Sequence, residues 1–277
     1  MSYKFAFFGT PYVGRDTLLK LLEHGWKPEV VIANPDAPRG RKQVMTASET
    51  KVLAQEHGIP VLTPESLDSD FIESLAKYAC DFAVVVAYGK ILPEALINAF
   101  SKGVLNIHYS LLPKYRGASP VEAALLSDDK ETGVTIQKMV HKLDAGDIIA
   151  ARTEAVLPDD TVITLRARLI ALGGDLLADT LPKYLNSEIK PLEQNEAEVT
   201  FAPKIKKEDG EVKLEDDAKQ NWNKYRAYAA WPGIFFIKNG KRVKITKAEM
   251  DAGRHFKILR VIQEGKKETD YDLWLKS

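Results

Sequence analysis

Cysteine is almost absent from this sequence, because Cys80 stands alone among 277 residues. A single cysteine excludes a disulfide within the chain, and it excludes the zinc sites that are built from several cysteines. Cys80 precedes Asp81 and the apolar run FAVVVA, so we interpret it as a packing residue. The sequence therefore argues against a disulfide-stabilised scaffold.

Long apolar runs are missing as well. No stretch reaches the roughly eighteen apolar residues that a membrane-spanning helix needs. The N-terminal MSYKFAFFGT is too short in its apolar part for a signal peptide, and it leads directly into a strand-and-turn pattern. With 45% apolar and 28% charged residues, the composition is typical of a soluble globular protein with a sizeable core. We therefore expect a cytoplasmic protein that has no membrane partner.

Several familiar catalytic motifs do not occur. In GTPYVGRD (9–16), two glycines have the spacing of a P-loop, but Arg15 and Asp16 stand where that loop needs Lys and Ser or Thr. The segment is not Gly-x-Gly-x-x-Gly either, so we favour a tight strand-to-helix turn over a phosphate site, and contact with a substrate stays open. Neither Gly-x-Ser-x-Gly nor His-Glu-x-x-His is present.

The net charge is zero, but the charges are unevenly distributed. Residues 1–199 hold 21 Lys and Arg against 27 Asp and Glu, out of 39 of each kind in the whole chain. Residues 200–277 hold the remaining 18 basic and 12 acidic side chains. A basic C-terminal part suggests a polyanionic partner for that part of the chain.

Short apolar runs alternate with amphipathic segments through the first two thirds of the chain. This alternation predicts a Rossmann-like α/β fold with a mostly parallel sheet that is covered on both faces. We expect strands near residues 4–8, 29–33, 81–87, 104–108, 133–139 and 147–153, the last of them a candidate for antiparallel pairing. We expect helices near residues 13–24, 48–57, 68–78, 93–100 and 161–185.

The pattern predicts a division into two domains joined by a linker. Residues 1–186 form the α/β domain, the polar and proline-bearing residues 187–206 form the linker, and residues 207–277 form a small basic β domain. In the last of these, FFIKNGKRVKIT consists of two alternating runs around Asn239-Gly240, which is a strong signal for a β-hairpin. A helix near residues 217–229 is expected to lead into it.

The C-terminal region interleaves cations with aromatic residues. No acidic residue occurs between Ala218 and Ala248, whereas this stretch contains Lys219, Lys224, Arg226, Lys238, Lys241, Arg242, Lys244 and Lys247. Alternation in the second hairpin strand places Arg242 and Lys244 on one face. Such a face suits a nucleic-acid surface, although lysines that merely solvate a small aromatic core give the same pattern.

The segment NPDAPRGRKQVMTASET (34–50) follows the second expected strand. It carries Arg39, Arg41 and Lys42 on what we expect to be a mobile loop. Loops at the carboxyl ends of strands often carry function, and clustered cations suit phosphate contacts. A solvated connector is an equally good interpretation of the same residues.

The stretch LNIHYSLLPKYRG (105–117) contains the best candidates for chemistry. Asn106 and His108 are two residues apart, so in a strand they point to the same face. A histidine can exchange a proton near neutral pH, and an asparagine amide can stabilise a developing oxyanion. The turn LDAGD could bring the carboxylate of Asp144 next to the histidine side chain. Spacing alone favours ordinary strand-end packing for these residues over catalysis.

The segments NIHYSLLPKYRGASP and TGVTIQKMVHKLDAGDII resemble the formyltransferase superfamily that uses 10-formyltetrahydrofolate. Within it, the resemblance is greatest to the family that formylates methionyl-tRNA, and it extends over residues 3–247. FFGTPYVG, NPDAPRGR, APKIKKEDGEV and AYAAWPGIFF are similar to that family's first turn, inserted loop, linker and entry to an OB-like C-terminal barrel.

The resemblance implies roles for particular residues. Its active-site Asn, His and Asp fall on Asn106, His108 and Asp144, and no metal is implied. The residues implied to bind the folate co-substrate are Tyr88, Gly89, Ile91, Ser110, Leu111, Leu112 and Pro113, with Lys114 to Gly117 bracing the loop. The residues that we expect to contact tRNA are Arg39, Arg41, Lys42, Lys241, Arg242 and Lys244.

The implied activity is transfer of a formyl group from 10-formyltetrahydrofolate to the α-amine of methionyl initiator tRNA by a monomeric enzyme of translation initiation. The alternative is a sugar-nucleotide N-formyltransferase, which shares the three active-site residues but does not account for the basic loop and tail. A folate- or RNA-binding module without catalysis is a third possibility, and it would not need all three residues.

The C-terminal segment departs from the family pattern. Only 27 residues follow Met250, which is short for the usual barrel of about five strands. We expect a reduced barrel, in which ILRVIQE and the DLWL segment are the last strands. This departure concerns tRNA binding and leaves the implied transfer chemistry unchanged.

Overall fold

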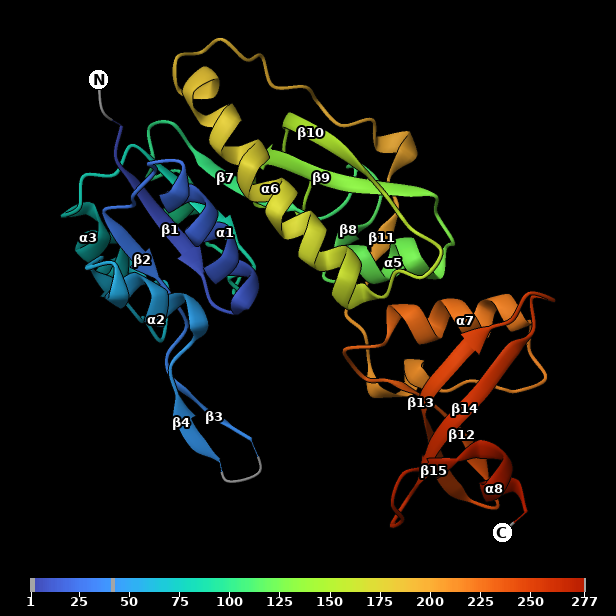
Figure 1. Ribbon diagram of the computed structural model, residues 1–277. Coiled ribbons are helices and arrows are strands. Elements are labelled where there is room, and N and C mark those ends of the chain that lie inside the picture. Colours follow the sequence, from blue (N-terminus) through green and yellow to red (C-terminus); the bar gives the residue numbers. More distant parts are fainter. Residues whose placement is uncertain (1–2, 41–42, 277) are drawn as a thin grey trace. The chain divides into compact units, whose positions relative to one another are not determined.

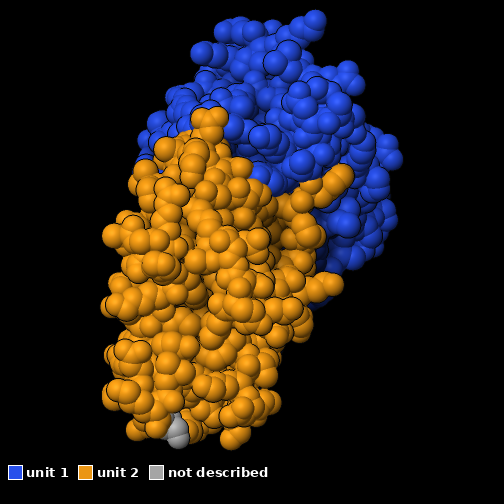
Figure 2. All heavy atoms as spheres, turned by 90° about the vertical axis from the view of Figure 1, so that its right-hand side faces the viewer, with its two compact units in different colours: residues 1–116, 133–153, 168–200 blue, residues 117–132, 154–167, 201–277 orange. Residues whose placement is uncertain are grey.

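The computed structural model describes residues 3–40 and 43–276 (Figure 1). The chain forms two compact units, which Figure 2 distinguishes in blue and orange. Unit 1 consists of residues 1–116, 133–153 and 168–200, and unit 2 of residues 117–132, 154–167 and 201–277. Neither unit is continuous in sequence. The linear boundaries expected at 186 and 206 therefore stay a prediction.

The sheet associated with unit 1 has seven strands within the described residues, in the order β10-β9-β7-β6-β1-β2-β5. The five strands β5, β2, β1, β6 and β7 pair in parallel, and β9 runs antiparallel to β7. The predicted α/β class with a mostly parallel sheet is confirmed. The strands are β1 (Phe5–Gly9), β2 (Val30–Ile32), β5 (Val61–Leu62), β6 (Phe82–Val86), β7 (Val104–His108), β9 (Glu131–Lys138) and β10 (Ile148–Ala155).

The central strands are buried along their whole length, as expected for a parallel sheet with covered faces. The helices that alternate with them are α1 (Tyr12–Glu23), α2 (Glu49–Glu56), α3 (Ser69–Ala76), α4 (Glu94–Ile97) and α6 (Val162–Leu185). Side-chain caps fix two of their starts, because Ser48 accepts a hydrogen bond from the Lys51 N–H and Asp68 accepts one from the Phe71 N–H. All five helices predicted for the α/β domain are present, and α4 is shorter than predicted.

The GTPYVG segment is the tight turn that we favoured from the sequence. A Cβ atom on Gly9 would lie 2.7 Å from the Phe7 ring, and one on Gly14 would lie 3.1 Å from the Gly9 Cα. Only glycines allow β1 and α1 to approach so closely. Packing between strand and helix accounts for both glycines.

Unit 2 contains an antiparallel sheet in the order β12-β13-β14-β15. The predicted hairpin is confirmed, because Lys238 pairs with Lys241 across Asn239 and Gly240, whose φ values are 51° and 71°. Within the described residues this sheet stays open. Its strands are β12 (Ile234–Lys238), β13 (Lys241–Met250), β14 (Phe256–Gln263) and β15 (Thr269–Asp270), and its helices are α5 (Pro120–Leu126), α7 (Ala218–Ala227) and α8 (Tyr271–Leu275).

The DLWL segment was expected as a strand, and that expectation is wrong. It lies in α8, where the Asp270 side chain accepts hydrogen bonds from the N–H groups of Asp272 and Leu273. Trp274 is the buried residue of this helix, and its indole donates to the Gln263 side chain. A local cap and one buried anchor outweigh the strand propensity of the segment. The ILRVIQ residues do lie in a strand, β14.

Two segments expected as loop and linker contain short regular structure. Residues 34–50 include the hairpin strands β3 (Ala37–Arg39) and β4 (Val44–Thr46). The expected linker contains a 3-10 helix (Glu196–Glu198) and β11 (Phe201–Ala202), which pairs with β8 (Arg116–Gly117). A second 3-10 helix spans Lys207–Gly210. In the described ranges, no helix combines the length and apolarity needed to cross a bilayer.

Candidate active site

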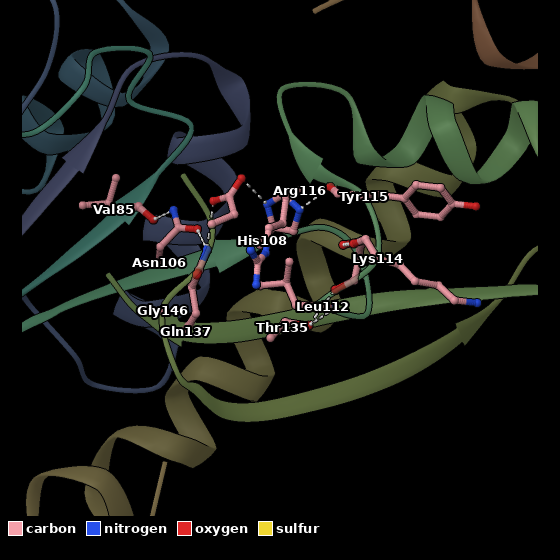
Figure 3. A network of polar contacts seen from close by, with 12 residues as sticks. Val85, Asn106, His108, Leu112, Lys114, Tyr115, Arg116, Thr135, Gln137 and Gly146 are labelled. Atoms are coloured by element: carbon pink, nitrogen blue, oxygen red, sulfur yellow. Dashed lines mark hydrogen bonds and ion pairs between the residues drawn. The ribbon is translucent and has the colours of Figure 1, made fainter. Parts of the chain in front are cut away.

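Asn106 and His108 lie at the carboxyl end of β7, between β6 and β9 (Figure 3). Asn106 is level with Val85 on one side and with Gln137 on the other. Because the two residues are two apart in a strand, their side chains share a face of the sheet, as predicted. The carboxyl ends of parallel strands are where ligands bind in open α/β sheets.

The surroundings of His108 fix the tautomer of its ring. Its Nε2 atom lies 2.8 Å from the carbonyl oxygen of Tyr115, and a carbonyl oxygen can only accept a hydrogen bond. Nε2 must therefore carry a hydrogen. Nδ1 faces the Asp144 carboxylate, with Oδ2 at 3.6 Å. The nitrogen that gains or loses a proton is thus the one beside Asp144.

Asp144 reaches His108 through the turn that the sequence suggested. The two side chains are nearly enclosed, with exposed fractions of 15% for Asp144 and 7% for His108. Asp144 adopts a left-handed backbone conformation, with φ of 47°. A Cβ atom on Gly146 would lie 1.7 Å from the Lys138 carbonyl oxygen, so only glycine fits there. The backbone of the LDAGD turn therefore places the carboxylate.

The amide of Asn106 is held at both of its ends. Nδ2 donates a hydrogen bond to the Val85 carbonyl oxygen at 3.0 Å, and Oδ1 accepts one from Gln137 Nε2 at 3.2 Å. An amide nitrogen carries two hydrogens. The second N–H of Asn106 is therefore the one that can be offered to a substrate oxygen.

The loop from Ser110 to Pro113 is built by its own hydrogen bonds. Ser110 Oγ donates to the Lys114 carbonyl oxygen at 2.6 Å, and Thr135 Oγ1 donates to the Ser110 carbonyl oxygen at 2.7 Å. The Leu112 N–H in turn donates to Thr135 Oγ1 at 3.1 Å. Ser110 and Leu112 are buried, whereas Leu111 and Pro113 are partly exposed. Leu111 and Pro113 are therefore the members of this loop that can contact a ligand through their side chains.

The residues predicted around the folate from the loop after β6 differ in exposure. Tyr88 is buried, its ring packs edge-on against Phe8, and burial raises the pKa of its hydroxyl to about 12. Gly89 is exposed, and Ile91 is 83% exposed. Tyr88 is thus a core residue, whose carbonyl oxygen accepts hydrogen bonds from Thr10 and Asn34. Gly89 and Ile91 form the surface of this loop.

The predicted tRNA contacts fall into two groups. In β13, Lys241 and Lys244 are exposed, whereas the Arg242 guanidinium lies 3.7 Å from the centre of the Phe235 ring. Val243 and Ile245 are buried, so the predicted alternation is confirmed. In the other group, the Arg39 backbone belongs to β3. Arg41 and Lys42 lie outside the described residues.

A bracing network surrounds the site, and most of it was not anticipated from the sequence. Arg116 is 1% exposed and donates from Nε and Nη2 to Gln194 Oε1, at 3.0 and 2.8 Å. Gln194 Nε2 donates to the carbonyl oxygens of Asp144 and Gly146. Arg116 also pairs with Glu196, and this hydrogen bond lowers the pKa of Glu196. The network therefore holds the turn that carries Asp144.

Arg116 belongs to the loop that we expected to brace the site, whereas Gln194 and Gln137 had no visible signal. Gln194 lies in the polar segment interpreted as a linker, 50 residues from the turn that it holds. Gln137 is two residues from Thr135 on β9, and only the register of β9 against β7 shows that it faces Asn106. That register could not be derived from spacing.

Comparison with known protein families gives two matches along the chain. Residues 3–181 match the model described as formyl transferase, and residues 204–268 match the one described as formyl transferase, C-terminal domain. The methionyl-tRNA formyltransferase of Lactobacillus gasseri is 43% identical over 244 residues, which cover 88% of this chain and 78% of the relative. That of Halalkalibacterium halodurans is 40% identical over 247 residues, covering 89% and 78%.

Solved structures share the fold at lower identity. An N-formyltransferase from Helicobacter canadensis, in complex with folinic acid and dTDP-3-aminofucose, matches with a TM-score of 0.70 and 20% identity over 90% of this chain and 88% of that one. The methionyl-tRNA formyltransferase from Clostridium thermocellum matches with a TM-score of 0.63 and 15% identity over 98% and 100%. At these identities the similarity concerns the fold alone.

Proposed function

The chain belongs to the formyl transferase family, and from this premise we propose that it transfers the formyl group of 10-formyltetrahydrofolate to the α-amino group of methionyl initiator tRNA. The product is N-formylmethionyl-tRNA, which starts translation. The observation that carries the formyl-transfer step is the arrangement of Asn106, His108 and Asp144, because its donors and acceptors match the needs of formyl transfer to an amine. The choice of methionyl-tRNA as the acceptor is supported by the relatives. Relatives about 40% identical bear the name of this activity.

The residues around the site fit a folate as co-substrate, which supplies the formyl group when it is bound. A pterin has a flat ring with a hydrogen-bonding edge, so it needs an apolar surface beside free backbone groups. Ile91 gives an exposed apolar side chain, and Gly89 gives backbone without a side chain. Leu111 and Pro113 offer further partly exposed apolar contacts. We assign the folate to these four residues. The buried Tyr88, Ser110 and Leu112 belong to the same two loops, and we assign them a supporting role in holding the loop backbone.

Asn106 has the first chemical role in this proposal. Attack of an amine on a formyl carbon moves negative charge onto the formyl oxygen. The second Nδ2–H of Asn106 can donate to that oxygen, because the Val85 carbonyl and Gln137 fix the rest of the amide. A donor that is already oriented needs no rearrangement when the charge appears, and such donors are an effective source of transition-state stabilisation.

His108 and Asp144 carry out the two proton transfers that the reaction needs. The attacking amine must lose a proton, and the folate nitrogen that departs must gain one. His108 Nδ1 is the nitrogen free to take up and return this proton, because Nε2 is committed to the Tyr115 carbonyl oxygen. Asp144, with Oδ2 at 3.6 Å from Nδ1, stabilises the imidazolium between these two steps. The transfer needs no covalent bond to the protein.

The tRNA is assigned to the cations of the hairpin and of the inserted loop. Lys241 and Lys244 are exposed on β13, where they can contact phosphates without losing other partners that the fold depends on. Arg242 is partly exposed as a residue, and its guanidinium lies over the Phe235 ring. Arg39, Arg41 and Lys42 remain the proposed contacts from the loop. A monomeric state and a cytoplasmic location also stay predictions.

A formyl-transfer assay with a panel of acceptors tests the proposal. The purified protein is given 10-formyltetrahydrofolate together with methionyl initiator tRNA, uncharged tRNA, or several amino-sugar nucleotides. We expect formylation of methionyl-tRNA alone. Transfer only to a sugar nucleotide would establish the alternative, a sugar-nucleotide N-formyltransferase, and would refute the tRNA assignment. Binding of folate and tRNA without any transfer would support a binding module.

A further inference from the structure

Gln137 connects two of the three proposed active-site residues. It lies on β9, is 1% exposed, and faces Asn106 across the antiparallel pair of β7 and β9. Its Nε2 atom donates to Asn106 Oδ1 at 3.2 Å (Figure 3). The same atom donates to Asp144 Oδ1 at 2.9 Å. One amide nitrogen therefore uses both of its hydrogens to join the oxyanion donor to the carboxylate.

Two backbone carbonyl groups determine the direction of every hydrogen bond in this network. The Val85 carbonyl oxygen can only accept, so Asn106 must present Nδ2 to it and Oδ1 to Gln137. Gln137 must then donate, which its Nε2 does. At the other end the Tyr115 carbonyl oxygen requires the hydrogen on His108 Nε2. No other assignment of the amide atoms satisfies both ends.

Gln137 also selects which carboxylate oxygen of Asp144 meets the histidine. Since Oδ1 of Asp144 accepts from Gln137, Oδ2 is the oxygen turned toward His108 Nδ1. The Oε1 atom of Gln137 is buried and has no hydrogen-bond partner among the described residues. A side chain kept only for packing would not need this unpaired oxygen, and an apolar residue of similar length would avoid it.

We propose that Gln137 is a positioning residue for formyl transfer, which holds the Asn106 amide and the Asp144 carboxylate in one fixed arrangement through its two N–H groups. This inference rests on the proposed function. Gln137 touches neither substrate in this scheme. Its loss should therefore affect the chemical step and leave substrate binding nearly unchanged.

The first test is Gln137→Met, which keeps the length of the side chain and removes both donors. We expect kcat to fall about a hundredfold, the effect of small misplacement of catalytic groups. The KM values for tRNA and folate should stay within about threefold of the wild type. Unchanged kcat, or a raised KM with unchanged kcat, would overturn the inference. Thr132→Val is the matched control on β9, because its buried hydroxyl has no partner among the described residues; it should leave kcat unchanged.

A second variant, Gln137→Glu, keeps the shape and makes donation depend on protonation. As a carboxylate it would face two acceptors, Asn106 Oδ1 and the ionised Asp144, whereas its protonated form regains one donor. The titratable groups around it in the described contacts are Asp144, which it would touch, and His108 behind Asp144. Burial and the two facing acceptors should raise the pKa of this carboxyl above its ordinary value of about 4.3. We therefore expect its kcat, relative to the wild type at the same pH, to rise as the pH is lowered. A constant or falling ratio would contradict the inference.

An NMR measurement that needs no substrate tests the role of Gln137 independently of the proposed function. The imidazole nitrogen resonances of His108, measured by NMR, report the tautomer and its contact with Asp144. Gln137→Met should change the Nδ1 resonance, because the carboxylate is released, and should leave the Nε2 resonance near its wild-type position. Identical spectra would refute positioning by Gln137. If the wild type formylates none of the acceptors, the proposed function fails, yet this comparison still decides the role of Gln137.

Discussion

The Nε2 atom of His108 lies 2.8 Å from the carbonyl oxygen of Tyr115, seven residues later in the chain. This contact closes the loop that follows β7 and at the same time assigns the proton of the ring. The Tyr115 N–H is itself held by the Thr200 hydroxyl at 2.8 Å, and the Arg116 N–H by the Thr200 carbonyl oxygen at 2.9 Å. The segment around Thr200 therefore supports the backbone that orients the histidine.

His108→Ala removes the group that we propose as proton carrier. Because Asn106 and the substrate contacts remain, the loss should appear in the chemical step, with kcat lowered about 10²- to 10⁴-fold. Steady-state kinetics with saturating 10-formyltetrahydrofolate and methionyl-tRNA measure it. His141, an exposed histidine in the same unit, gives a matched control as His141→Ala. A His108→Ala enzyme with near-normal kcat would show that another group carries the proton.

Asp144→Asn tests the charge beside Nδ1 while keeping the shape of the turn. The variant can no longer stabilise an imidazolium, so we expect a loss in kcat of at least about a hundredfold with little change in KM. Asp147 lies three residues further along and is exposed, so Asp147→Asn removes the same charge without touching His108. Equal losses in the two variants would mean that the overall charge of the turn matters, and not the contact with His108.

Arg116→Met tests the bracing network. The substitution leaves Gln194 Oε1 buried and without the two donors that now satisfy it, so the free energy of unfolding should fall by about 2–3 kcal/mol. The pair of Arg116 with Glu196 should contribute far less, because Glu196 is largely exposed to solvent. Denaturant titration of Arg116→Met and Glu196→Gln compares them. If Glu196→Gln lowered the free energy of unfolding by as much as Arg116→Met, the main stabilising contact would be the ion pair of Arg116 with the exposed Glu196.

The elements defined by local pattern could be predicted from the sequence, and the long-range contacts could not. Hydrophobic runs and the Asn239-Gly240 turn predict β1, β6, β7 and the β12–β13 hairpin, because their signals lie within a few residues. The shared face of Asn106 and His108 follows from strand geometry in the same way. The approach of Asp144 to His108 was only a suggestion from the sequence, since a contact over 36 residues depends on the register of β9 against β7.

Polar segments were the hardest to interpret. Residues 187–206 have the composition of a linker, yet Leu192 exchanges two backbone hydrogen bonds with Ile148. Gln194 donates hydrogen bonds to two backbone carbonyl oxygens of the turn that carries Asp144. The DLWL segment has strand-forming side chains, yet a cap from Asp270 starts a helix. In both cases a few specific hydrogen bonds outweigh the average tendency of the composition.

The basic face of β13 gives a prediction about salt. Lys241 and Lys244 are exposed, and each phosphate contact that is lost should reduce the slope of log K against log salt by about one. The double variant Lys241→Gln with Lys244→Gln should therefore raise the KM for tRNA at low salt. It should also reduce the slope of log K against log salt by about two. The KM for folate and kcat should not change, because the proposed function gives these lysines no part in folate binding or in the transfer step.

Lys257→Gln is the control for this experiment. Lys257 lies on β14, in the same sheet, and is exposed, but its ammonium already pairs with Glu249 at 3.6 Å. Its removal should leave the salt slope for tRNA unchanged, because a paired lysine releases few counterions on binding. If the double variant and the control behave alike, the lysines of β13 only solvate the sheet. If only the double variant flattens the slope, the hairpin contacts the nucleic-acid backbone, since a loss of general charge would have affected both proteins.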